Sequence, residues 1–247
     1  MNSIFNKYDL HKFYIDLEKF SISLSDLQVE QFLLYYEMLV ERNKMINLTA
    51  ITEFDEVLKK HFIDSLSLVK AYDLCGDKSE ITLIDIGTGA GFPGIPLKIA
   101  FPHLKITLLD SLNKRVDFLR EVIFTLELSD IEVLHGRAED YAKSNQLREH
   151  FDLCVSRAVA NLSVLSEYCL PYVKVGGSFV SYKSDKILEE KKGAESAIQI
   201  LGGKVEEQVG FYLPDSDLYR NLIIVKKIEN TPEKYPRKAG TVTKRPL

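Results

Sequence analysis

Strand-like and helical stretches alternate along the chain from residue 81 onward. This alternation is typical of parallel strands joined by right-handed helical crossovers, with helices on both faces of the sheet. Two further apolar runs, 204–213 and 219–227, are separated only by PDSDL, so we expect them to pair antiparallel. The chain is therefore predicted to be α/β, with a doubly wound, mostly parallel, seven-stranded Rossmann-like sheet and a terminal antiparallel hairpin. The five earlier strand-like runs are 81–86, 105–110, 131–136, 151–156 and 177–183.

The first 75 residues have a helical pattern instead. Ser25 and Gln28 have the spacing of a capping box, and apolar residues recur after them at helical spacing. A second helix is predicted over 54–72, with a loop at 43–52 between the two. We therefore expect an N-terminal helical extension, residues 1–75, and a core, residues 76–247, that ends in a basic tail. The apolar stripe of the first helix comprises Phe32, Leu33, Tyr36, Leu39 and Val40.

Charge is unevenly distributed along the chain. The net charge is −4, yet residues 226–247 hold seven Lys or Arg against two Glu. A basic tail on an acidic body favours a focal contact with an anionic partner, although a solvated terminus has the same composition. No apolar run approaches the roughly 18 residues of a membrane span, and no signal pattern begins the chain, so a cytoplasmic protein is expected. Three scattered cysteines, Cys75, Cys154 and Cys169, predict reduced thiols and no metal site.

The most specific local pattern is the loop DIGTGAGFPG at residues 85–94, which follows a predicted strand and opens a helix. A loop for a nucleoside triphosphate ends in Lys followed by Ser or Thr, and no such pair is present here. A dinucleotide loop has glycines at positions 1, 3 and 6, but Phe92 occupies the sixth position. Glycines at positions 1, 3 and 5 are common in S-adenosylmethionine sites, and Gly87, Gly89 and Gly91 supply them. The alternative is a tight turn whose glycines serve packing alone.

Two acidic residues after the next strands support an adenosyl cofactor. Asp110 ends the second strand, 23 positions after Gly87, where a carboxylate is well placed to accept hydrogen bonds from both ribose hydroxyls. Glu139 follows the third strand, in a loop that flanks the adenine in such folds. Because parallel strands end at one edge of the sheet, both residues are predicted to lie near the glycine loop. The alternatives are an ordinary turn role for Asp110 and a helix cap for Glu139.

Longer stretches resemble a known family. They are NLTAI (47–51), KHFIDSL (60–66), the glycine loop through Leu97, DSLNKR (110–115), GRAE (136–139), SRAVA (156–160) and YPRKAG (235–240). From about residue 25 to its end, the chain resembles the ribosomal RNA small subunit methyltransferase G family, also called glucose-inhibited division protein B. It departs from the usual pattern at Thr88, where the family often has Ser, and at Val242, where it often has Pro. Neither change removes a charge or a required glycine.

The resemblance implies a bacterial cytoplasmic enzyme that transfers a methyl group from S-adenosylmethionine to N7 of one guanine in 16S rRNA. The implied partner is 16S rRNA within a small ribosomal subunit or an assembly intermediate, and a monomer is the default expectation. The alternatives are an NAD-dependent oxidoreductase, a non-catalytic RNA-binding assembly factor, and a methyltransferase for proteins or small molecules. The implied cofactor contacts are Gly87, Phe92, Asp110, Ser111, Leu112, Ala138, Glu139 and Arg157.

Guanine N7 carries a lone pair and no proton, so its methylation requires no general base. We expect the site to place N7 in line with the methyl group and sulfur. Arg157 is expected to bind cofactor or RNA, with a salt bridge to a neighbouring Asp as the alternative. Phe92 either faces the sulfonium or packs a helix on the sheet, and His61 is expected to be structural or to contact RNA. The candidate RNA contacts are Lys59, Lys60, His61, Arg115, Lys183, Arg220, Arg237, Lys238, Lys244 and Arg245.

Overall fold

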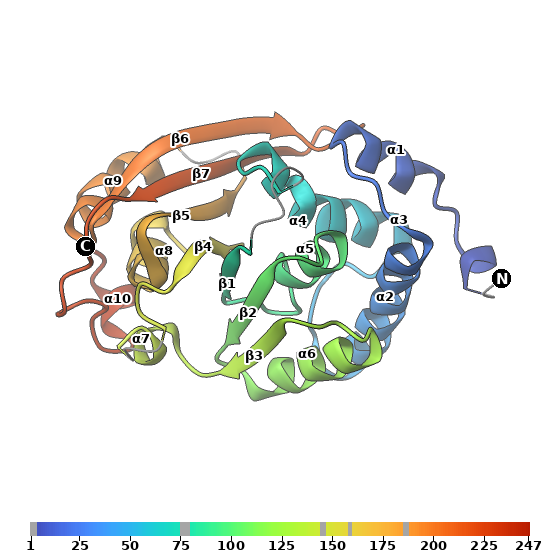
Figure 1. Cartoon of the computed structure of the whole chain (residues 1–247), viewed down its shortest axis with the longest axis horizontal. Coiled ribbons are helices and arrows are strands. Elements are labelled where there is room, and N and C mark those ends of the chain that lie inside the picture. The colour runs from blue at the N-terminus through green and yellow to red at the C-terminus, as the bar shows by residue number, and fades with distance from the viewer. Residues whose placement is uncertain (1–3, 75–79, 144–146, 158–159, 185–187) are drawn as a thin grey trace.

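A seven-stranded sheet forms the centre of the molecule (Figure 1). The computed structural model describes residues 4–74, 80–143, 147–157, 160–184 and 188–247. The strand order is β3-β2-β1-β4-β5-β7-β6; the first five strands in this order pair in parallel, and β7 pairs antiparallel with β5 and β6. The predicted fold is thereby confirmed. The strands are β1 (Thr82–Ile86), β2 (Lys105–Asp110), β3 (Ile131–His135), β4 (Phe151–Ser156), β5 (Val173–Lys183), β6 (Gly203–Tyr212) and β7 (Tyr219–Lys227).

The start of β5 differs from the prediction. The strand begins at Val173 rather than at residue 177. Its first residues include an exposed stretch, 174–176, that ends in a glycine, and this stretch lacks the apolar pattern on which the prediction rested. Backbone pairing with β4, which aligns Phe151 with Val173, extends the strand there, and Lys174 forms an ion pair with Asp152 of β4.

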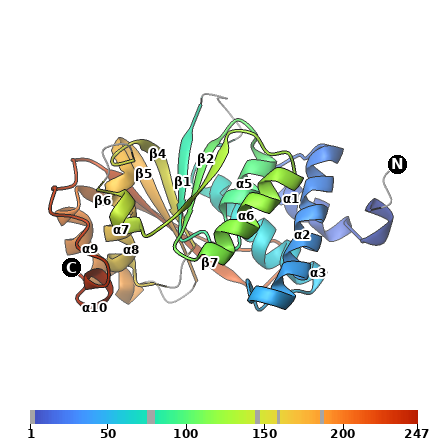
Figure 2. The ribbon, with the colours of Figure 1, turned by 90° about the horizontal axis from the view of Figure 1, so that it is seen from below.

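Helices cover both faces of the sheet (Figure 2). Alternate strand residues point to opposite faces, so Leu83 belongs to one apolar core and Ile84 to the other. One face carries α5 (Gly94–Ala100) and α6 (Asn113–Thr125), with the N-terminal helices outside them. The other face carries α7 (Ala138–Tyr141), α8 (Leu162–Cys169), α9 (Leu188–Ile200) and α10 (Thr241–Lys244), with the 3-10 turn η4 (Leu170–Tyr172) after α8. Among the described residues, no helix has the length and apolarity needed to cross a membrane.

The N-terminal helices share the apolar core of the first face. These elements are η1 (Phe5–Lys7), α1 (His11–Lys19) and α2 (Asp26–Ile46). The predicted capping box is confirmed, because the Ser25 hydroxyl accepts from the Gln28 backbone N–H and the Gln28 side chain accepts from that of Ser25. The predicted loop start at residue 43 is wrong, since α2 continues to Ile46. It ends where Asn47 adopts the left-handed conformation, with φ 48°.

The second predicted helix, 54–72, is a continuous helical segment with a change of winding in its middle. It comprises α3 (Phe54–Val57), the π-helical turn η2 (Leu58–Ile63), α4 (Asp64–Leu66) and the 3-10 turn η3 (Ser67–Lys70). A π-helical turn shifts the backbone hydrogen bonds by one residue and is frequent at functional sites. This turn lies where the chain faces the carboxyl end of β4, as described below.

The C-terminal tail folds back over α7 and α8 instead of remaining solvated. Arg148 donates to the carbonyl oxygens of Thr231 (2.6 Å) and Tyr235 (2.9 Å), and Arg237 pairs with the buried Glu167 of α8. Tyr235 is buried as well. The alternative of a solvated terminus is therefore wrong for Thr231 and for residues 235–237, whereas residues 232–234 are exposed.

The predicted thiols are confirmed in part. Cys154 and Cys169 are free and buried, on β4 and α8. Cys75 lies outside the described residues, as do the predicted boundary between residues 75 and 76 and residues 158–159 of the SRAVA stretch.

Candidate functional site

The glycine loop after β1 leaves open space above its first two glycines. Gly87 and Gly89 have φ of 71° and 63°, and a Cβ added to either would meet no atom within 4 Å. Gly91 differs, because an added Cβ would lie 2.6 Å from Ile95 Cγ1 and 2.7 Å from the Tyr35 hydroxyl. The first two glycines thus let a ligand approach the backbone. Gly91 permits close packing against α2 and α5, and its predicted cofactor contact stays a prediction.

Asp110, the last residue of β2, is hydrogen-bonded to this loop. Its Oδ2 accepts from the backbone N–H of Gly89 (2.9 Å), and its Oδ1 accepts from that of Leu112 (2.9 Å). Arg115 lies 3.4 Å from Oδ2. A carboxylate has about four acceptor positions, and three are used when the long Arg115 contact is counted, so Asp110 has one position free and a second if that contact is released. Beside it, Ser111 and Leu112 are exposed, so an apolar surface is available to a flat ring.

Glu139 lies in the first turn of α7, in the segment that connects β3 to β4. Its side chain is 5% exposed, yet within the described residues its carboxylate forms no hydrogen bond or ion pair. Its oxygens are not among the fully enclosed polar atoms that lack a partner, so they reach solvent and a ligand donor can reach them. The neighbouring Ala138 carbonyl accepts from the Tyr172 hydroxyl (2.6 Å), which fixes the backbone of α7. The predicted adenosyl cofactor therefore fits this edge: open glycines, an acceptor for a ribose, and an unpartnered carboxylate.

Asp85 is a residue that the sequence interpretation did not single out. It is fully buried at the end of β1, where its Oδ2 accepts from the Thr88 hydroxyl (2.7 Å) and the Gly94 N–H (2.9 Å). Its Oδ1 has no hydrogen-bond partner among the described residues. Burial raises the pKa of Asp85 to about 6, although these two hydrogen bonds oppose the shift. Its position as the first residue of the glycine-loop pattern was the available signal.

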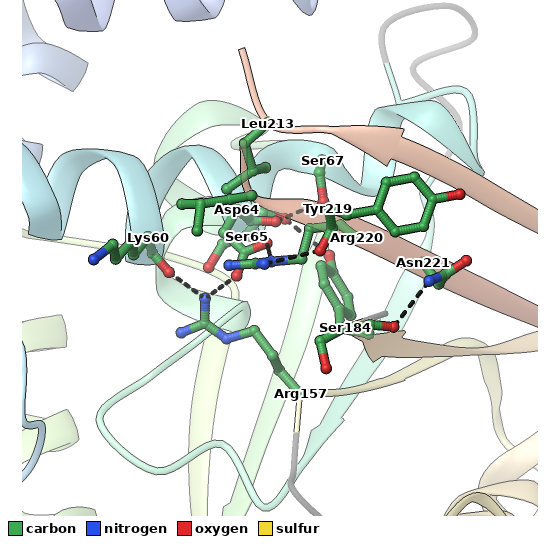
Figure 3. Close-up of polar contacts among 12 residues, drawn as sticks. Lys60, Asp64, Ser65, Ser67, Arg157, Ser184, Leu213, Tyr219, Arg220 and Asn221 are labelled. Atoms are coloured by element: carbon green, nitrogen blue, oxygen red, sulfur yellow. Dashed lines mark hydrogen bonds and ion pairs between the residues drawn. The ribbon is translucent and has the colours of Figure 1, made fainter. Parts of the chain in front are cut away.

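Arg157, at the end of β4, contacts the π-helical turn (Figure 3). Its Nη1 donates to Asp64 Oδ2 (3.1 Å) and to the carbonyl oxygens of Lys60 (3.1 Å) and His61 (3.4 Å). The salt bridge considered as the alternative for Arg157 is therefore present. Its guanidinium carbon also lies 5.0 Å from the centre of the Phe92 ring. A contact from Arg157 to cofactor or RNA stays a prediction.

Phe92 and His61 are stacked beside Arg157. Their ring centres are 4.5 Å apart, and Phe92 is buried against Tyr35 and Phe62 as well. Phe92 thus packs between α2 and the π-helical turn, and whether it also meets a sulfonium stays a prediction. His61 Nε2 lies 2.8 Å from the Thr49 hydroxyl, and burial lowers the pKa of His61 to about 4. His61 is therefore neutral at physiological pH.

The side chains predicted to contact RNA fall into two groups. The first group is paired with carboxylates: Lys59 with Asp16, Lys60 with Glu56, Arg115 with Asp110, Lys183 with Glu190, Arg220 with Asp64, and Arg237 with Glu167. Lys238, Lys244 and Arg245 are exposed, and none has an ion pair to another described residue. For every member, contact with RNA stays a prediction.

His61 and Asp85 have opposite effects on the pH dependence of stability. Burial, and then the Arg157 charge, lowers the pKa of His61 from 6.5 to about 4, whereas burial raises the pKa of Asp85 from 3.8 to about 6. Between pH 4 and 6, only the unfolded chain holds the His61 proton, so His61 makes the free energy of unfolding rise with pH. In the same pH range only the folded chain holds the Asp85 proton, so Asp85 makes the free energy of unfolding fall as the pH rises. Each slope is about 1.4 kcal/mol per pH unit, and the two nearly cancel.

We expect His61→Gln to remove one of these slopes. Relative to the unsubstituted protein, its free energy of unfolding should fall by about 1.4 kcal/mol per pH unit between pH 4 and 6. Asp85→Asn should give a difference of the opposite sign over the same range. Urea unfolding at pH 4, 5 and 6 measures both. A difference for His61→Gln that does not change with pH would contradict the neutral buried imidazole.

The model of one protein family, rRNA small subunit methyltransferase G (GidB), matches residues 28–219. The chain belongs to this family. The ribosomal RNA small subunit methyltransferase G of Lachnoclostridium phytofermentans is 54% identical over 239 residues, which are 97% of this chain and 98% of that protein. The protein of the same name from Clostridium novyi is 50% identical over 100% of both chains. The resemblance and the methyltransferase class predicted from the sequence are confirmed.

Solved structures of low sequence identity share the fold of this family member. M. jannaschii TYW2, solved in complex with AdoMet, superposes with a TM-score of 0.54 at 13% identity, over 72% of this chain and 80% of that one. A putative transferase from Pyrococcus horikoshii gives 0.53 at 12% identity, over 68% and 64%. At such identities the likeness shows the common architecture alone.

Proposed function

We propose that this protein transfers the methyl group of S-adenosylmethionine to N7 of a specific guanine in 16S rRNA. The observation that carries the proposal is the membership of the family over 28–219, joined to an edge of the sheet that suits the cofactor. When bound, S-adenosylmethionine supplies an electrophilic methyl group on a sulfonium. Membership of a methyltransferase family argues against the oxidoreductase and the non-catalytic assembly factor.

The chain's own residues bind and orient the reactants. The open backbone at Gly87 and Gly89 admits the cofactor, Asp110 accepts the ribose hydroxyls, and the Glu139 carboxylate accepts a donor from the adenine side. Since guanine N7 has no proton to lose, His61 is not required as a base, and its lowered pKa and buried stacking suit a structural role. Rate enhancement then comes from holding N7 near the methyl group in line with the sulfur.

The RNA partner is proposed to be a small ribosomal subunit or an assembly intermediate, met by a cytoplasmic monomer. Because most basic side chains near the site are already paired with carboxylates, few phosphates are expected to be neutralised. The exposed Lys238, Lys244 and Arg245 extend the contact along the tail. With the proposed domain division, 1–75 and 76–247, both domains contribute residues near the cofactor edge, since His61 of the first stacks on Phe92 of the second.

Methyl transfer from labelled S-adenosylmethionine to unmethylated small subunits tests the proposal. We expect one methyl group per subunit, at N7 of a single guanine, located by chemical cleavage at 7-methylguanine and primer extension. Subunits that already carry the modification are the control and should accept no label. Free 16S rRNA in a parallel reaction distinguishes the particle from the naked strand as substrate. Label on another base, or on protein alone, would contradict the assignment.

A further inference from the structure

Three side chains of α2 donate hydrogen bonds to backbone carbonyls of the core, where α2 lies against α5 and α6 (Figure 2). Gln28 donates to Ile99 (2.7 Å), in the last turn of α5. Gln31 donates to Leu126 (2.8 Å), directly after α6. Tyr35 is the third donor and lies one helical turn further along. The first two contacts hold the carboxyl ends of α5 and α6, whereas the third reaches the glycine loop.

The Tyr35 hydroxyl meets the glycine loop at Ala90. It donates to the Ala90 carbonyl oxygen at 2.5 Å and, within the described part of the chain, is the only donor to that oxygen. Tyr35 is fully buried, and this burial raises the pKa of its hydroxyl well above the usual range, so the group stays protonated and able to donate. Ala90 is buried as well, so loss of the donor would leave a buried carbonyl without a hydrogen bond.

Other aromatic rings fix the ring of Tyr35. It stacks on Phe62 of the π-helical turn, with ring centres 5.4 Å apart and planes 16° apart. Its centre also lies 5.5 Å from that of Phe92. At Gly91 an added Cβ would lie 2.7 Å from the Tyr35 hydroxyl, so the loop passes close to this group. These contacts hold the hydroxyl oxygen in place against the loop.

The loop requires such a contact because its glycines allow it many shapes. Gly89 and Gly91, on either side of Ala90, have φ of 63° and 105°, and glycine is the residue with the greatest backbone freedom in an unfolded chain. The N–H of Gly89 donates to Asp110 Oδ2 (2.9 Å), and Tyr35 holds the residue that follows. The loop is therefore held from two sides, by the sheet and by the N-terminal helix.

We propose that Tyr35 is a positioning residue for the cofactor, whose hydroxyl fixes the glycine loop in the shape that receives S-adenosylmethionine. The inference rests on the proposed function above. Tyr35 acts through Ala90 and does not touch the cofactor, because its side chain is fully buried. A loop that is fixed before the ligand arrives binds it at a smaller cost in conformational entropy. Bound cofactor then holds the loop itself, so the rate at saturation does not depend on Tyr35.

Tyr35→Phe tests the inference, because it removes the hydroxyl and keeps the ring. We expect the KM and the Kd for S-adenosylmethionine to rise about tenfold, the scale of one lost hydrogen bond to a buried group. The kcat and the KM for unmethylated small subunits should change by less than about twofold. A residue that only stabilised the fold would reduce the amount of active protein, and hence kcat, and leave the KM for the cofactor unchanged.

Tyr36→Phe and Gln31→Met are matched controls from the same helix. Tyr36 is the next residue, and its hydroxyl donates to the Thr52 carbonyl (3.1 Å) instead of the loop. Gln31 holds the residue after α6. Each control removes one hydrogen bond between a side chain of α2 and a backbone carbonyl. Both should keep the Kd for S-adenosylmethionine within about twofold of the unsubstituted protein.

Amide hydrogen exchange gives a second measurement, which needs no variant that folds well. In the unsubstituted protein without cofactor, the N–H groups of Gly89 and Gly91 should already be protected, because the loop is fixed in advance. In Tyr35→Phe the same two groups should exchange about tenfold faster, while the N–H groups of β2 keep their rates.

Three results would overturn the inference: an unchanged Kd for S-adenosylmethionine in Tyr35→Phe, an equal rise in either control, or unprotected Gly89 and Gly91 in the unsubstituted protein. If the unsubstituted protein bound no S-adenosylmethionine, the proposed function would fail instead, and the exchange of the loop would still test the contact between Tyr35 and Ala90. Calorimetry of the unsubstituted protein with the cofactor is therefore done first.

Discussion

Arg237→Met is expected to lower the free energy of unfolding by about 3–5 kcal/mol. Glu167 is fully buried in α8, and Arg237 donates to it from Nη2 (2.6 Å), Nε (2.9 Å) and the backbone N–H (2.7 Å). Of the described residues, only Arg237 donates to this carboxylate. The substitution therefore leaves a buried charge with one weak donor, and urea unfolding at neutral pH measures the loss.

The companion variants separate the charge effect from simple loss of the tail contact. Adding Glu167→Gln to Arg237→Met should recover most of the stability, because neutralising both partners removes the unpaired charge. Arg245→Met, an exposed cation in the same tail, should change stability by less than about 0.5 kcal/mol. Equal losses from Arg237→Met and Arg245→Met would mean that the buried pair does not anchor the tail.

Asp110→Ala should weaken S-adenosylmethionine binding by about 100-fold or more. The carboxylate is expected to accept two ribose hydroxyls, and a hydrogen bond to a charged group contributes about 1.5–3 kcal/mol. The substitution also frees the Gly89 and Leu112 backbones, which Asp110 holds at 2.9 Å each. Titration calorimetry with the cofactor measures the change.

Asp117→Ala provides a control from the neighbouring helix. Asp117 is exposed on α6 and pairs weakly with Arg120 at 3.7 Å, so its loss should leave cofactor affinity within about twofold. Asp110→Asn keeps one acceptor oxygen, so its affinity for S-adenosylmethionine should lie between the affinities of Asp110→Ala and Asp117→Ala. If Asp110→Ala bound the cofactor as tightly as the unsubstituted protein, the ribose site would have to lie elsewhere.

The sheet was predictable because its central strands β1, β2 and β4 are almost wholly buried and all its strands are bounded by clear turns. Buried parallel strands are continuous apolar runs, and these runs set most strand ends to within one residue. β5 was the exception, since its first residues pair through the backbone while their side chains are exposed. The end of α2 was missed for a related reason: its last turn, residues 43–46, contributes no buried side chain, and the helix ends at the left-handed Asn47.

The placement of the proposed cofactor residues at one edge of the sheet could be predicted because they follow successive strands in chain order. The contacts on the other side of the site could not, since Asp64 is 93 residues from Arg157 and 156 residues from Arg220 in the sequence. No spacing rule covers such contacts, and neither the π-helical turn nor the unpartnered oxygen of Asp85 has a pattern in the sequence. Resemblance to the family located the segments but not the pairing between them.

Arg148 is bound mainly by backbone carbonyls that are synthesised more than eighty residues after it. Its guanidinium joins the carbonyl at the end of α7, on Ala142, to the carbonyls of Thr231, Pro232 and Tyr235. A nascent chain that has not yet delivered residue 231 from the ribosome leaves Arg148 with Ala142 alone, and Glu167 still lacks Arg237. The contacts that hold α7, which carries Glu139, are thus complete only after residue 237 has been made, so a chain truncated shortly before residue 231 should have a loosened α7.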